Sequence, residues 1–253
     1  MDAGLVAADT GLPLRVRTRI QRRRWFFSGM TVAVIVTVLV GFGPTYYFKE
    51  YFGTRPLPLR VHVHGALFTA WVLLFAAQVG LIAARRVSLH RRLGVVGGLL
   101  VIPMVVSGFW VAVAVGRSPP RVNLDASAMA GLSPLAALAI PLTSVVIFPL
   151  LVGLGLFYRR STDIHKRLMF LATIALLPPA LGRIPFLAAR GPAGFFGVTI
   201  LFILALAAYD YRTRGRVHLI TLWGGLFLSA SFPGRLVLGN TETWHSFARW
   251  LIR

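Results

Sequence analysis

Two short histidine-containing segments are the residues of this chain best suited to chemistry. Residues 88–94 read SLHRRLG and residues 163–169 read DIHKRLM, so that a histidine, two basic residues and a leucine recur 75 positions apart. Each segment is followed by a long apolar run. Imidazole is a common metal ligand and an axial ligand of haem iron. The repeat therefore indicates either a ligand pair or two basic anchors that face the membrane surface.

Three of the six histidines are expected at one membrane face, at the inner ends of apolar spans. They are His90, His165 and His218, and together they form a candidate metal site. Below His90, a helical register places Gly94, Gly97 and Gly98 on the histidine face. Such a glycine row offers a groove for a flat cofactor such as haem, or it permits close packing of two helices. Interfacial histidines that complete a basic elbow remain the alternative.

A second group of candidates is expected at the opposite face. His62 and His64 are two residues apart, which is about 200° around a helix, so both cannot face one centre while the segment is helical. Arg183 lies beside a proline near the outer end of a span. Intramembrane arginines are usually paired, which points to an anion such as a haem propionate or a lipid phosphate. Snorkelling of the arginine to the interface is the alternative.

The candidate haem-binding residues are therefore His62, His64, His90, His165 and Arg183. A histidine site for iron, zinc or copper would instead use His90, His165 and His218. The inner and outer groups are separated by about 30 Å of helix, so they cannot share one site.

The elements that position these residues are transmembrane helices. The chain has 253 residues, of which 57% are hydrophobic and only 13% charged, whereas soluble domains carry about 25% charged residues. The charges cluster between apolar runs of about 18 residues or more, which is typical of membrane-spanning helices. We expect an all-α bundle of seven spans, at roughly 25–43, 61–83, 94–116, 134–157, 168–189, 194–212 and 218–236. The double proline Pro178–Pro179 predicts a break in the fifth span.

Charge placement predicts the orientation of the bundle. The net charge is +20, and the basic residues lie mainly in connections on one side, as the positive-inside rule requires. We therefore expect a bilayer rather than nucleic acid as partner. The expected organisation is a basic cytoplasmic tail (1–24), a transmembrane domain (25–236) and an interfacial amphipathic segment (237–253), with the N-terminus cytoplasmic and the C-terminus periplasmic.

Several chemistries are excluded by composition and motif. The chain has no cysteine, which excludes disulfides, thiolate ligands and c-type haem attachment. It also lacks a G-x-S-x-G elbow, an H-E-x-x-H motif and a Walker motif. Any bound metal must rely on histidine, carboxylate, methionine or carbonyl oxygen.

The stretches VHVHGALFTAWVLLFAAQVGLIAARRVSLHRRLG and STDIHKRLMFLATIALLPPALGRIP resemble a family of bacterial multi-span membrane proteins without an assigned activity. That family is distantly similar to small membrane proteins linked to cytochrome oxidase assembly, and more loosely to b-type cytochromes. The match covers about a quarter of the chain, with LHRRLG its most distinctive piece. The resemblance implies an inner-membrane protein and points to His62, His64, His90 and His165.

Three hypotheses about function follow. In the first, the protein binds haem b or a metal for electron transfer or respiratory-complex assembly, with a respiratory-chain or other membrane protein as partner. In the second, it is a cofactor-free module that binds lipid or a partner protein. In the third, it is a metal-dependent membrane hydrolase that uses a metal-activated water.

Overall fold

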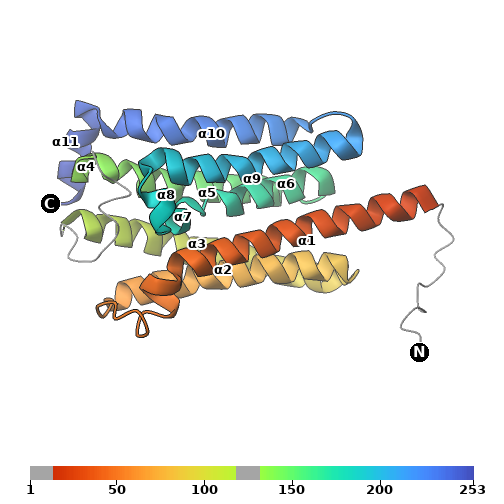
Figure 1. The fold of residues 1–253 in the computed structure, drawn as a ribbon, viewed down its shortest axis with the longest axis horizontal. Coiled ribbons are helices and arrows are strands. Elements are labelled where there is room, and N and C mark those ends of the chain that lie inside the picture. Colours follow the sequence, from red (N-terminus) through yellow and green to blue (C-terminus); the bar gives the residue numbers. More distant parts are fainter. Residues whose placement is uncertain (1–13, 118–131) are drawn as a thin grey trace.

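The protein is an all-helical bundle, as the sequence predicts (Figure 1). The computed structural model describes the backbone of residues 14–117 and 132–253, and the side chains from residue 25 onward within those ranges. No strand occurs in these ranges. The elements are α1 (Leu14–Phe42), the π-helical η1 (Gly43–Tyr47), α2 (Leu59–Ala83), α3 (Val87–Arg117), α4 (Pro134–Ala137), α5 (Ala139–Phe157), α6 (Thr162–Ile174), α7 (Pro178–Leu181), α8 (Pro185–Ala188), α9 (Gly191–Arg214), α10 (Leu219–Gly239) and α11 (Glu242–Leu251).

The long helices run side by side, so the bundle has two ends (Figure 1). We call the end with the α2–α3, α5–α6 and α9–α10 connections the elbow end. The other end, which holds η1, α4 and α11, is the far end. Of the predicted basic tail 1–24, residues 1–13 lie outside the described part, and the backbone from Leu14 onward continues into α1.

Six helical segments within the described ranges are long and apolar enough to cross a membrane, and they coincide with the first six predicted spans. The seventh predicted span corresponds to α10, which has 21 residues and lies alongside α9 in Figure 1. It is not among those six segments. Seven spans and the sidedness of the termini therefore remain predictions.

The fifth span is broken where the sequence predicts it. Helix α6 ends at Ile174, and the short helix α7 begins at Pro178. A proline at 178 has no N–H to donate to the carbonyl of Ile174, so the α-helical ladder cannot continue through it. The break separates α6, which carries His165, from the segment that carries Arg183.

Helix α6 is the centre of the bundle. Phe170, Leu171 and Ile174 have no exposed surface, whereas Leu73 of α2, Val95 of α3 and other large apolar side chains on the outer helices are mostly exposed. Exposed apolar surface of this extent is unfavourable in water and favourable in lipid. The burial pattern therefore matches a bundle immersed in a bilayer, with α6 shielded by its neighbours.

The C-terminal helix α11 lies across the far end (Figure 1). Trp244 is buried, and its indole N–H donates to the carbonyl oxygen of Leu135 at 2.8 Å. Phe247 and Trp250 are exposed. This division gives the helix one face on the bundle and one apolar outer face, consistent with the predicted amphipathic segment; its position at a membrane interface remains a prediction.

Because the chain lacks cysteine, single cysteines can report the number of spans. We expect Arg160→Cys, in the α5–α6 connection, and Glu242→Cys, on α11, to react with a membrane-impermeant thiol reagent from opposite sides of the membrane. Both positions are exposed. Labelling of intact and of opened cells, with the cysteine-free parent as blank, checks this. Labelling from the same side would mean that α10 does not cross.

Candidate functional site

The two histidine elbows are structurally equivalent. His90 is the fourth residue of α3 and His165 the fourth residue of α6. Their backbone N–H groups donate to Arg86 and Ser161 respectively, each four residues earlier, at 3.1 and 2.9 Å. The two segments therefore share one local geometry: each begins a helix and places its histidine in the first turn.

The structure brings these two histidines together. The ring centroids of His90 and His165 are 6.2 Å apart, with the ring planes crossed at 86°. The Nδ1 of His165 is 2.7 Å from the carbonyl oxygen of Gly155 in α5. A carbonyl only accepts, so Nδ1 carries a proton, and in the neutral tautomer with this hydrogen bond the lone pair is on Nε2. A hydrogen bond of this kind is what usually orients a metal-binding histidine.

Two buried polar atoms near this pair have no hydrogen-bond partner. They are Nδ1 of His90 and Oε1 of Gln78 in α2. The Gln78 side chain lies along α3, because its Nε2 is 3.5 Å from where a Cβ of Gly94 would stand, one turn after His90. Buried polar atoms without partners are uncommon. Gln78 is therefore a further residue of the candidate site. In the sequence it could have been noticed as a single amide side chain within an apolar span.

The glycine row of α3 serves helix packing. A Cβ on Gly97 would lie 3.1 Å from Leu74 of α2, and one on Gly98 would lie 3.3 Å from Leu156 of α5. These leucines fill the face that the sequence offered as a groove. The packing alternative therefore describes this surface, and no flat slot follows the glycines.

His218 belongs to a different group of contacts. It caps α10, where its Nδ1 accepts from the backbone N–H of Ile220 at 3.1 Å. Because Nδ1 accepts this backbone N–H, it carries no proton. Within the described ranges no three His, Asp or Glu side chains form a group that would hold a metal ion. The predicted three-histidine set is thus not assembled there.

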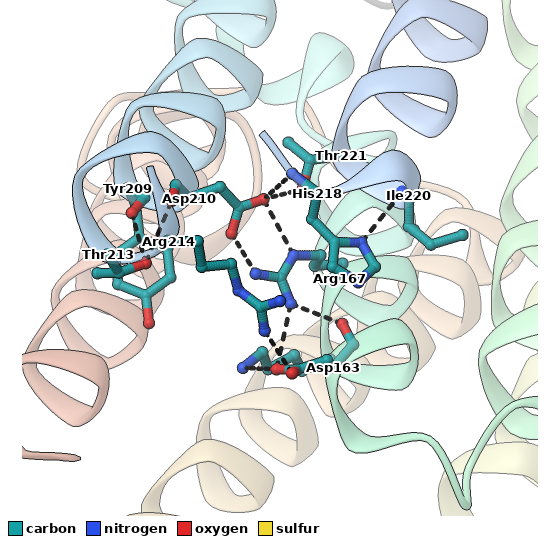
Figure 2. A network of polar contacts seen from close by, with 10 residues as sticks. Asp163, Arg167, Tyr209, Asp210, Thr213, Arg214, His218, Ile220 and Thr221 are labelled. Atoms are coloured by element: carbon teal, nitrogen blue, oxygen red, sulfur yellow. Dashed lines mark hydrogen bonds and ion pairs between the residues drawn. The ribbon is translucent and has the colours of Figure 1, made fainter. Parts of the chain in front are cut away.

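A buried ion pair lies beside His218 (Figure 2). The side chains of Arg167 in α6 and Asp210 in α9 are both fully buried. The Arg167 Nε donates to Asp210 Oδ2 at 3.1 Å, and NH2 donates to Oδ1, which makes the contact bidentate. Asp210 also accepts from the Thr221 hydroxyl and from the backbone N–H of His218. One carboxylate thus ties α6, α9 and the start of α10 together.

Asp163 forms the outer half of this network. It accepts from Arg214 of α9 and forms an ion pair with Lys166 at 2.6 Å. Its backbone carbonyl accepts from Arg167 at 2.7 Å. Asp163 and Arg167 are four residues apart and share one face of α6, while His165 points about 200° away from Arg167, toward α5. Helix α6 thus directs its charged side chains toward α9 and the imidazole of His165 toward α3 and α5.

The Arg167–Asp210 pair was not predicted, although the sequence contained a signal for it. Asp210 is an acidic residue within a long apolar run, and such a residue is usually paired with a cation inside the bundle. The positive-inside rule had assigned Arg167 to the membrane surface, whereas its side chain is fully buried. Charge counting cannot distinguish these two roles.

The far-end candidates do not join the elbow-end pair. His64 of α2 contacts the buried Ser107 of α3, with 3.3 Å between Nδ1 and the hydroxyl oxygen. His62 instead lies beside Tyr46, whose hydroxyl donates to the His62 carbonyl at 3.1 Å. The two histidines thus face different partners, as their spacing in a helix predicts. Both lie near the N-terminus of α2, at the far end.

Arg183 lies at the same end and is held by its own segment. Its NH1 donates to the carbonyl oxygen of Pro179 at 2.6 Å, and its guanidinium stacks over the Phe42 ring at 4.6 Å. Arg183 thus links the broken fifth span to the end of α1. An anion beside Arg183 remains a prediction.

Comparison with known proteins yields no relative: no family model, no curated protein and no solved structure matches the chain.

The buried ion pair generates a stability prediction. Asp210→Asn leaves the Arg167 charge buried and unpaired, so we expect a loss of about 3–5 kcal/mol in unfolding free energy. The matched control Asp163→Asn alters a carboxylate that is 38% exposed, and we expect it to cost about 0–1 kcal/mol. Chemical denaturation in detergent micelles measures both. Equal losses would contradict the central role of Asp210.

Proposed function

We propose that this multi-pass membrane protein of the bacterial inner membrane binds one metal centre through His90 and His165, with the elbow end in the cytoplasm. The observation that carries the proposal is the 6.2 Å separation of the two imidazole centroids, at equivalent positions on two helices. The sidedness rests on the concentration of arginines at the elbows.

The separation of the rings fits shared ligation of one metal. Metal–imidazole bonds are about 2.0–2.1 Å long, so the centres of two rings on one ion lie on the order of 5–6 Å apart. His165 is held in the orientation that frees Nε2, and His90 has an unpartnered Nδ1. Both starting requirements of a ligand pair, proximity and free lone pairs, are thus supported.

A single transition-metal ion fits the packing best. Imidazole suits zinc, copper, iron and nickel, and Gln78 supplies an unpaired amide oxygen nearby. With so few protein ligands, positions on the ion stay open for water or a substrate. When bound, such an ion acts as a Lewis acid or, for iron and copper, as an electron carrier. The protein residues orient it and shield it from lipid.

Haem b is the second candidate, favoured by ligand number. Haem iron takes only two axial ligands from the protein, and the described elbow end brings two histidines together rather than a full set for a bare ion. The filled glycine face opposes it, because a macrocycle along α3 would have to displace Leu74 and Leu156. A haem version would serve electron transfer or respiratory-complex assembly, as the resemblance to cytochrome-linked proteins implies.

Metal content and the visible spectrum of the detergent-purified protein test the proposal. We expect close to one metal per chain from metal-replete cells. His90→Ala and His165→Ala should each lower the metal affinity by about 10–100-fold or more, since even residues that only support a ligand have effects of this size. A Soret band would identify haem iron, and its absence with bound metal would identify an ion.

His62→Ala is the matched control, because it removes a histidine at the far end of the bundle, away from His90 and His165, and should leave the metal content unchanged. A metal-free and colourless protein from haem- and metal-replete cells would overturn the proposal. Equal loss of metal in all three variants would place the metal elsewhere. The first of these results would leave the cofactor-free alternative, a lipid- or protein-binding module, and the second would exclude His90 and His165 as the specific ligand pair.

A further inference from the structure

Arg235 is a buried cation that lies outside the proposed metal centre. It lies in α10, one turn before the helix ends at Gly239, on the far end of the bundle. Its residue surface is only 2% exposed. Removing a guanidinium from both water and headgroups is costly unless an anion or a full set of acceptors compensates.

The protein supplies only part of that compensation. Arg235 NH1 donates to the hydroxyl oxygen of Ser144 in α5 at 2.9 Å, and NH2 donates to Ser231 at 3.4 Å. Nε is buried without a partner. A guanidinium carries five N–H donors, so two hydrogen bonds leave most of them unused. Both serine hydroxyls already donate to carbonyls of their own helices, which makes their oxygens available only as acceptors.

The charge of Arg235 is also unbalanced among the described residues. The ion pairs found there join Glu50, Asp163 and Asp210 to other cations, and Arg235 is in none of them. The nearest compensation is aromatic: the rings of Phe232 and Phe196 are 5.3 and 5.9 Å from the guanidinium carbon. Such a ring contact stabilises a desolvated cation, but a ring carries no net negative charge and does not replace an anion. Arg167 at the elbow end differs, because its guanidinium is paired with the buried carboxylate of Asp210.

Position and burial define which ligand fits. A lipid phosphate is confined to the headgroup layer, whereas the Arg235 side chain is enclosed by α5, α9 and α10. A small monovalent anion would have to pass only the single remaining turn of α10 to reach this side chain. It would meet unused N–H donors and a positive charge, and it would relieve the buried unpartnered Nε.

We propose that Arg235 binds a small monovalent anion, a halide or a short carboxylate, between α5, α9 and α10 at the far end of the bundle. The site is independent of His90 and His165, so its failure would leave the metal proposal untouched.

Anion-dependent stability of the purified protein tests this site. At constant ionic strength, replacing the bulkier anion gluconate with chloride or formate should raise the melting temperature saturably by about 2–4 °C or more. Arg235→Gln should abolish the rise. Arg190→Gln is the matched control, because Arg190 also stacks on a phenylalanine, at 3.6 Å, but is exposed; it should keep the rise.

The wild type alone can overturn the proposal, so the test does not depend on the folding of Arg235→Gln. No saturable response to chloride or formate would refute the site, and so would an equal response in the wild type and Arg235→Gln. A further variant, Asp125→Asn, changes a carboxylate outside the described ranges. If the wild type shows no anion response and Asp125→Asn creates one, a carboxylate of the chain fills this role, and the proposal fails.

Discussion

The fully buried pair of Arg167 and Asp210 is the interaction on which the elbow end depends. A bidentate contact between two enclosed charges is favourable only when both stay in place, because either charge alone would be stranded in a low-dielectric interior. Asp210 accepts from α6, from the α10 cap and from Thr221, so it fixes three helices at one point. The rotation of α6 about its axis is therefore set.

That rotation decides where His165 points. With Arg167 turned toward α9, His165 faces α5, where the Gly155 carbonyl receives its Nδ1–H. His90 then meets it across the end of α5. The arginine of the DIHKRLM segment is thus a positioning residue for the histidine two places before it. In SLHRRLG the corresponding basic residue, Arg92, is exposed. The two segments therefore place their histidines in the same way, but only the arginine of DIHKRLM is buried in an ion pair.

Much of the fold follows from the sequence, because span length and apolarity are local properties. The six apolar segments and the break at Pro178 are set by residues within each helix. The partner of Asp210, the filling of the glycine face by Leu74 and Leu156, and the meeting of Gln78 with α3 are different. They depend on how helices far apart in sequence rotate against one another, which no local pattern encodes. The proximity of His90 and His165 was one of two open alternatives for the same reason.

Cross-linking in the cysteine-free chain measures this geometry directly. With His90→Cys and His165→Cys combined, a short bifunctional thiol reagent should give an intrachain product in membranes, and Arg167→Met should slow its formation strongly by releasing the rotation of α6. His62→Cys with His165→Cys, at opposite ends, should give none. Absence of the His90–His165 product, or its formation at an unchanged rate in Arg167→Met, would contradict an elbow site held together by the buried ion pair.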